Sequence, residues 1–264
     1  MDDRIGKNEQ VEVFRHLLFL DRRSYFAICQ SVMRILTEVL PDIDFREGYL
    51  ILIDKPLDWT SFDVVKKLRG TLCRYQQIKK LKVGHAGTLD PLATGLLVIA
   101  VGKYTKELQH LQLLSKSYSG SLKLGSWTDT YDAEGEERPG EVDVDQISFE
   151  VVVKASEQFV GNIMQVPPLY SAIKIKGQKA YSIARRGKKV EMKPRPVRVD
   201  SWNLFNSNWP EIDFEVVCGT GTYIRSMAHD LGQVLKTGGY LTGLSRTSVG
   251  DFQLSDAWNL HELV

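Results

Sequence analysis

The spacing of hydrophobic positions changes along the chain between a strand-like and a helix-like period. Continuous apolar runs at residues 49–53 and 96–101 are typical of buried strands. Residues 117–124 alternate between polar and apolar side chains, as a half-buried strand does, and residues 211–218 are also expected to form a strand. Between these segments, residues 132–140 are charged and rich in glycine and proline, which predicts a turn or hairpin tip.

Helical patterns separate the predicted strands. Thr60 with Asp63 three positions later resembles a capping box, and apolar side chains at residues 64, 65 and 68 supply one buried face. Residues 106–114 and 224–236 are also expected to be helical. Because the order is neither a strict strand–helix alternation nor all strand, the pattern predicts an α+β fold with a mixed or mostly antiparallel sheet.

The first 46 residues differ from the rest of the chain. Ile28, Val32, Ile35 and Val39 fall on one face of a helix, and Pro41 is expected to end it. Residues 1–46 are therefore predicted to be a helical N-terminal extension of unknown role, or translated sequence upstream of the true start. Residues 47–264 are predicted to be a separate, single domain.

Composition narrows the class of protein. The chain has 264 residues, of which 43% are hydrophobic and 25% charged, which is ordinary for a globular protein. Three well-separated cysteines without a C-x-x-C motif argue against a disulfide framework or a zinc site and favour a cytoplasmic protein. No apolar run approaches the roughly 20 residues that span a bilayer. The net charge is only +1, so a polyanionic partner would need a local basic patch.

One loop places a carboxylate within unusually bent backbone. Residues 84–95 read GHAGTLDPLATG, so that Asp90 lies among three glycines and directly before a proline. Glycines permit sharp turns and close approaches, and the loop could therefore hold Asp90 out into a cleft. The competing interpretation is a turn aspartate that bonds its own backbone. His85 lacks a neighbouring cysteine or second histidine, so a metal site is not favoured.

This loop resembles the signature of the TruB family, the tRNA pseudouridine-55 synthases. Other segments resemble further family motifs in the same order, and the resemblance covers about residues 47–264. These segments are DKP at 54–56, KSY at 116–118, GSWTDTYD at 125–132, QVPPLYSAIK at 165–174, KAY at 179–181, ARRG at 184–187, GTGTYIRS at 219–226 and LSRT at 244–247.

The resemblance implies a fold and an activity. It implies the pseudouridine synthase fold, a mixed and mostly antiparallel sheet flanked by helices and loops, with a basic thumb-like insertion at about residues 171–198. It also implies isomerisation of uridine to pseudouridine at position 55, in the T-loop of tRNA. The target base would be flipped out of the loop. No cofactor and no metal would be needed, and the enzyme would be a cytoplasmic monomer without an obligatory protein partner.

The resemblance also assigns roles to residues. Asp90 would attack the base or the sugar, or stabilise positive charge at C1′. Arg225 would keep Asp90 ionised, and Tyr118 would stack on the target base and help to remove its C5 proton. An exposed helix arginine and a core aromatic are the competing interpretations of Arg225 and Tyr118. Three further positions match substrate-binding residues of the family: His85, Tyr223 and Leu244.

The predicted insertion is strongly basic. Residues 173–198 contain ten Lys or Arg and one Glu. A charge run is commonly a solvated face, but here it overlaps the thumb that the resemblance implies. We expect this segment to grip the phosphates of the T-arm, and Lys55 to contact the RNA backbone as well. The basic residues singled out for this role are Arg185, Arg186, Lys188 and Lys189.

Two alternative functions are kept open. The chain could act as an RNA-folding chaperone through the same tRNA-binding surface, without catalysis. It could also belong to the guide-RNA-dependent branch of the superfamily, which works in a multiprotein particle and normally carries a C-terminal PUA-type module. Only 18 residues follow Arg246 in the sequence, so such a module is not expected here. It also has Ser245–Arg246 where the family usually has two arginines, so one backbone contact to RNA is expected to be missing.

Overall fold

The structure is a computed structural model that describes most of the chain. The described residues are 43–171, 173–175, 177–180, 183, 186 and 191–260. The predicted helix at residues 28–39 lies outside the described residues. Ile43 and Phe45 already pack into a hydrophobic core, so the folded region begins before the predicted boundary at residue 47.

The elements follow one another in a mixed α and β order. In the first half they are β1 (Tyr49–Lys55), α3 (Ser61–Tyr75), β2 (Val83–His85), β3 (Ala93–Val101), the 3-10 helix η3 (Gly102–Glu107), α4 (Leu108–Leu113), β4 (Lys116–Leu124), β5 (Ser126–Trp127) and β6 (Arg138–Pro139). In the second half they are η4 (Val144–Gln146), α5 (Phe149–Ser156), η5 (Glu157–Phe159), β7 (Gly161–Gln165), β8 (Lys174–Ile175), β9 (Gln178–Lys179), β10 (Arg195–Asn208), β11 (Glu211–Cys218), α7 (Ile224–Leu235), β12 (Gly239–Val249), β13 (Phe252–Gln253), η6 (Leu254–Asp256) and β14 (Trp258–Asn259).

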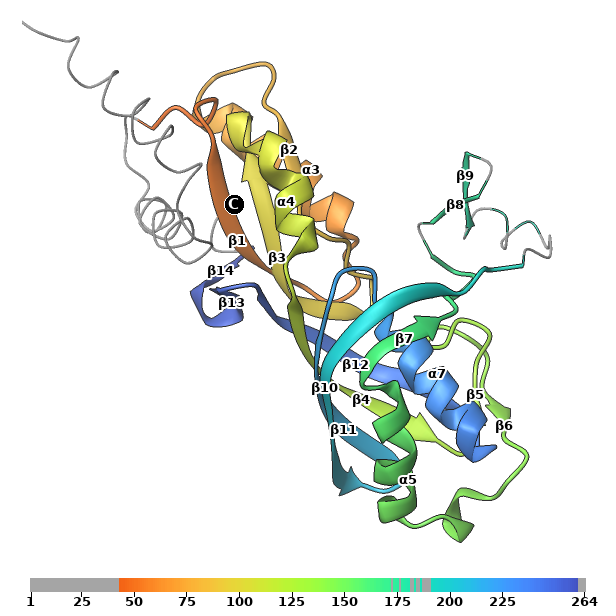
Figure 1. Cartoon of the computed structure of the whole chain (residues 1–264). Helices are drawn as coiled ribbons and strands as arrows, with labels where there is room; N and C mark the ends of the chain where they lie inside the picture. Colours follow the sequence, from red (N-terminus) through yellow and green to blue (C-terminus); the bar gives the residue numbers. More distant parts are fainter. Residues whose placement is uncertain are drawn as a thin grey trace, which may run out of the picture.

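One large sheet runs through the described part of the molecule (Figure 1). Its strand order is β14-β1-β3-β12-β4-β11-β10-β7, with β2 paired to β3 and β13 paired to β12. The pairs β1–β14 and β3–β12 are parallel, and the other pairs of this sheet are antiparallel. The predicted α+β fold with a mixed, mostly antiparallel sheet is confirmed.

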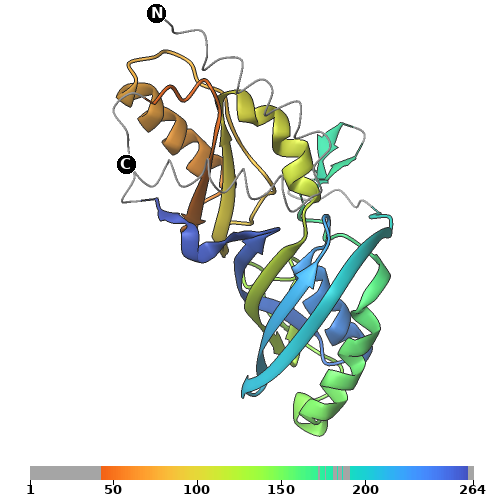
Figure 2. The same ribbon diagram turned by 60° about the vertical axis from the view of Figure 1, so that its left-hand side comes forward.

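Helices cover the sheet differently in its two halves. In the first half α3 packs on one face of β1 and β3, and α4 packs on the other face. Both faces of these strands are therefore buried, which explains their continuous apolar runs. In the second half α7 and α5 cover the strands β4, β11 and β10 (Figures 1 and 2). Strand β12 joins the halves, because it pairs with β4 along its length and with the start of β3.

Several local predictions are tested by the structure. Thr60 and Asp63 form the expected capping box, each side chain accepting a hydrogen bond from the other residue's backbone N–H at 3.1 Å. The predicted helix at residues 106–114 is present as the short helix α4, Leu108–Leu113, and its first two residues belong to the preceding 3-10 helix η3. The sheet also resumes at Arg195, inside the predicted insertion, while the β8–β9 hairpin stands apart from it (Figures 1 and 2).

No helix in the described part of the chain is long and apolar enough to cross a membrane.

Candidate active site

The loop that carries Asp90 is attached to the start of helix α3. Ser61 Oγ donates a hydrogen bond to the Leu89 carbonyl at 3.0 Å and accepts one from the Leu89 N–H at 2.8 Å. The Asp58 N–H donates to the Pro91 carbonyl at 3.0 Å. Backbone groups on both sides of Asp90 are thus held by neighbouring elements, and the carboxylate has a defined position.

Close backbone approach explains one of the loop's glycines. Gly95 has φ +94°, and a Cβ there would lie 2.5 Å from the Arg246 carbonyl oxygen on the paired strand β12. The Gly95 N–H also donates to Asp54 Oδ1 at 3.2 Å. Any side chain at this position would push β3 and β12 apart, so glycine is required by the register that brings Asp90 to β12.

The Lys55 side chain hydrogen-bonds backbone carbonyls around the same loop. The prediction that it contacts RNA is therefore wrong. The side chain of Lys55 is fully buried. The ammonium donates to the carbonyls of Pro56, Trp59 and Pro91 at 2.8, 2.6 and 3.2 Å. An ammonium has three donor hydrogens, so none remains for a phosphate. Burial lowers the pKa of Lys55 to about 8.

Arg225 connects Asp90 with a second carboxylate. One terminal nitrogen lies 2.9 Å from Asp90 Oδ2, and the other lies 3.1 Å from Asp132 Oδ2. The same guanidinium donates to the carbonyls of Thr130 and Tyr170 at 3.0 and 2.9 Å. Four acceptors therefore fix the plane of the arginine, and the predicted pairing of Asp90 with Arg225 is present in the structure.

The three charged side chains differ in accessibility. The side chains of Arg225 and Asp132 are only 5% and 6% exposed, whereas that of Asp90 is 41% exposed. Asp90 is thus the member of the network that a substrate can reach. Burial raises the pKa of Asp90, and the positive charge of Arg225 opposes this rise, while Asp132 adds to it. The arginine therefore favours the ionised form of Asp90.

Hydrogen bonds with Gln165 and Val166 fix the start of helix α7, so that Arg225 faces the loop that carries Asp90. The side chain of Gln165, at the end of β7, accepts from the Tyr223 N–H at 2.8 Å and donates to the Tyr223 carbonyl at 3.0 Å. Ser226 Oγ donates to the Val166 carbonyl at 2.8 Å. These hydrogen bonds involve the QVPPLY stretch, whose Tyr170 carbonyl also binds Arg225, so this segment orients the arginine from two sides.

Tyr118 lies on β4 opposite Arg246 of β12. The Arg246 guanidinium is buried and donates to the carbonyls of Leu96 and Gly87 at 2.7 and 3.2 Å. The pairing of Arg246 with Tyr118 and its hydrogen bonds to the carbonyls of Gly87 and Leu96 connect Tyr118 with the signature loop and the strand that follows it. Burial raises the pKa of Tyr118, so its phenol is protonated at neutral pH.

A small cleft beside Asp90 is lined in part by β12. Its volume is about 10 Å³, which is room for about one water molecule. Leu244 lines this cleft, as predicted for an apolar pocket residue, together with Asp132 and Arg225. Within the described residues, no group of three or more His, Cys, Asp or Glu is placed to hold a metal ion.

Comparison with known proteins identifies the family. The model of the N-terminal domain of the TruB family pseudouridylate synthases matches residues 74–224, and the model of the tRNA pseudouridylate synthase B C-terminal domain matches residues 225–264. The chain belongs to the TruB family.

Relatives and solved structures agree with this assignment. The tRNA pseudouridine synthases B of Phocaeicola vulgatus and Bacteroides fragilis are each 47% identical, over 81% and 80% of this chain and 91% of theirs. The crystal structure of a Cbf5–Nop10–Gar1 complex matches with a TM-score of 0.62 and 26% identity. That match covers 85% of this chain but only 56% of the matched chain.

The remaining predicted site residues come from three parts of the sequence. His85 ends β2, where burial lowers the pKa of its imidazole and favours the neutral form. Tyr223 precedes α7, and the Arg195 guanidinium lies 4.9 Å from its ring centroid. Arg186 is exposed in a turn. Arg185, Lys188 and Lys189 lie outside the described residues, so their role stays a prediction.

The prediction of the TruB site omitted Asp132. In the sequence this residue belongs to a matching motif and to the start of a charged turn, neither of which marks it as a site residue. Its side chain instead points inward, where Oδ1 accepts from Thr130 Oγ1 at 2.6 Å and from the Glu134 N–H at 3.1 Å. The one signal in the sequence was an acid within a TDTYD run that precedes a glycine-containing turn.

Proposed function

We propose that this chain isomerises uridine 55 in the T-loop of tRNA to pseudouridine, without cofactor or metal. The observation that carries the proposal is the half-exposed Asp90 held 2.9 Å from the buried Arg225. Membership of the TruB family and the names of the relatives, tRNA pseudouridine synthase B, support the reaction and the substrate.

The reaction rearranges one nucleotide. The N1–C1′ bond breaks, the base turns, and C5 bonds to C1′; the C5 proton passes to water and N1 takes up a proton from water, so the product is an isomer of the substrate. Asp90 attacks the nucleotide or stabilises the developing positive charge at C1′. Because Tyr118 is protonated at neutral pH, its proposed role is to stack on the base, and not to remove the C5 proton.

Substrate binding is proposed to use the remaining site residues. The base is flipped towards Asp90, with Leu244 and Tyr223 beside it and His85 in the space that the base leaves. Arg185, Arg186, Lys188 and Lys189 grip the T-arm phosphates. The chain acts on tRNA as a monomer and without a protein partner. The higher identity to the synthases than to the Cbf5 complex supports this choice over a guide-RNA particle.

The test is Asp90→Asn, compared with the wild type on unmodified tRNA transcripts. Mapping of pseudouridine should show product at position 55 only with the wild type, while both proteins bind tRNA with similar affinity. Product at another position would contradict the proposed substrate site. If the wild type forms no product yet refolds misfolded tRNA as well as Asp90→Asn does, the chaperone alternative replaces the proposal.

A further inference from the structure

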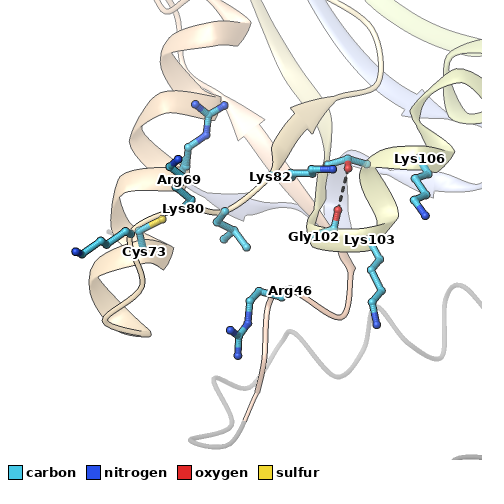
Figure 3. Close-up of a pocket in the computed structure, with 11 residues that line it drawn as sticks. Arg46, Arg69, Cys73, Lys80, Lys82, Gly102, Lys103 and Lys106 are labelled. Carbon is cyan, nitrogen blue, oxygen red and sulfur yellow. Dashed lines mark hydrogen bonds between the residues drawn. The ribbon is translucent and has the colours of Figure 1, made fainter.

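A large basic pocket lies at the end of the first half of the sheet, away from Asp90 (Figure 3). Its volume is about 860 Å³. Arg69 of α3, three lysines of the following loop, two lysines of η3 and Arg46 line it. The loop lysines are Lys79, Lys80 and Lys82, and the η3 lysines are Lys103 and Lys106. Four segments of the chain thus contribute basic residues to the lining of one hollow.

The positive charge of the pocket is largely unneutralised. None of the described residues that line it is Asp or Glu. Arg46 and Lys103 pair with Asp44 and Glu47 at 2.9 and 2.7 Å, but both pairs are exposed and contribute little energy. In the part of the chain that the structure describes, the other five cations form no ion pair. Since the whole chain carries only +1, this is a strong local concentration of charge.

The sequence shows the same imbalance. Residues 64–89 contain seven Lys or Arg and not one Asp or Glu. A solvated basic face is usually convex, whereas these side chains surround a hollow that also includes the apolar side chain of Leu81 and the Cys73 thiol. A concave basic site concentrates the electrostatic field and suits a ligand with several phosphates.

The position of the pocket relative to Asp90 indicates which part of an RNA could reach it. Strand β3 begins at Ala93, beside Asp90, and is followed by Gly102, which lines the pocket. At about 3.3 Å per residue this places the two sites on the order of 30 Å apart. With roughly 3.4 Å per nucleotide step along a duplex strand, the distance corresponds to about eight or nine steps. Nucleotides around the flipped base cannot fill both sites.

We propose that this pocket binds the sugar-phosphate backbone of the substrate RNA at a second place, outside the loop that contains the target uridine. The proposal rests on the proposed function, since it takes tRNA as the ligand. It predicts that full-length tRNA uses the pocket and that an isolated T-arm stem-loop does not. The chemistry recognised is a run of phosphodiesters, held by lysine ammonium groups without base-specific hydrogen bonds.

The test combines Lys79→Gln with Lys80→Gln, two exposed side chains whose replacement should not disturb the fold. The matched control combines Lys154→Gln with Lys236→Gln, which removes the same charge from exposed positions elsewhere. Affinity for full-length tRNA and for the T-arm stem-loop is measured as a function of salt. The combination Lys79→Arg with Lys80→Arg keeps the charge and should bind like the wild type.

We expect the pocket variant to bind full-length tRNA at least threefold more weakly and to bind the stem-loop normally. Its salt slope should fall by about 1.4–1.8, because two phosphates are no longer neutralised by lysine. Equal weakening for both RNAs, equal weakening in the control, or unchanged binding would overturn the proposal. So would a variant that is impaired only in binding to phosphatidylglycerol vesicles. Absence of pseudouridine with the wild type would instead overturn the proposed function, because binding is measured without turnover.

Discussion

Replacing Arg225 by lysine tests whether the geometry of the guanidinium, and not only its charge, supports catalysis. In the wild type two terminal nitrogens serve Asp90, Asp132 and two backbone carbonyls at 2.9–3.1 Å. A lysine ammonium is a point charge with three donors and cannot bridge both carboxylates in this way. The variant therefore lacks at least one charge-assisted hydrogen bond, which is worth about 1.5–3 kcal/mol.

This difference translates into a defined kinetic effect. If the missing interaction is the one to Asp90, about 1.5–3 kcal/mol corresponds to a fall in kcat of roughly tenfold to 150-fold. KM for tRNA should change little, because the arginine is buried and the residues proposed to bind phosphates lie elsewhere in the sequence. The assay is release of tritium from tRNA labelled at C5 of uridine, since that hydrogen leaves when C5 bonds to C1′.

A matched control and a stability measurement make the result interpretable. Arg138→Lys changes an exposed arginine that pairs with Asp129 at 2.9 Å, and it should leave kcat unchanged. The thermal unfolding midpoint of Arg225→Lys is measured in parallel. A kcat within threefold of the wild type, in a folded variant, would refute the argument that the bridging geometry matters.

Three other substitutions test the surroundings of Asp90. Asp132→Asn removes a negative charge that raises the pKa of Asp90, so the acid limb of the pH profile of kcat should move to lower pH. An acid limb at the same or a higher pH would contradict this. Gly95→Ala should abolish turnover without preventing tRNA binding, because its Cβ would lie 2.5 Å from the Arg246 carbonyl oxygen; near-normal turnover would show that β3 and β12 can separate. Lys55→Met leaves three buried carbonyls unpaired, so the free energy of unfolding should fall by at least about 2 kcal/mol. The calorimetric unfolding midpoint should then fall by roughly 4–8 °C, and an unchanged midpoint would argue against the supporting role of Lys55.

The central strands were predictable because burial on both faces of β1, or on alternate positions of β4 and β11, leaves a simple pattern. Strand β11 has the predicted bounds, and β1 and β4 differ from them by one or two residues. Strand β10 was not predicted, because most of its side chains are exposed and its pairing with β11 contains two irregularities. A polar strand stabilised by its neighbours has no strong periodicity of its own.

The side chains of the candidate site that carry the chemistry could be predicted from the sequence, but the backbone groups that orient them could not. Asp90, Tyr118 and Arg225 stood out through the motifs that surround them. The carbonyls of Thr130 and Tyr170, which orient Arg225, have no signature in a sequence, because every residue has a carbonyl group. The burial of Lys55 was also hidden, since a lysine at a strand end looks the same whether its ammonium meets carbonyls or phosphates.

The basic pocket was not predictable for a similar reason. The predicted thumb concentrates its charge in one run of 26 residues, and a sequence scan finds it at once. The pocket residues are spread from Arg46 to Lys106, and only the fold of α3, the following loop and η3 brings them together. The sequence shows an excess of basic residues between 64 and 89, but not that Arg46, Lys103 and Lys106 join some of them around one hollow.

The parallel pairing of β12 with β3 has a consequence for how the enzyme is made. Arg246 reaches back to the Leu96 carbonyl across 150 residues of sequence. A ribosome that adds about 5–20 residues per second needs roughly 8 to 30 seconds between the two. For most of that interval the nascent chain carries Asp90 but lacks both Arg225, which pairs with it, and Arg246, which binds the loop that holds it. Catalytic competence is therefore gained only at the end of translation.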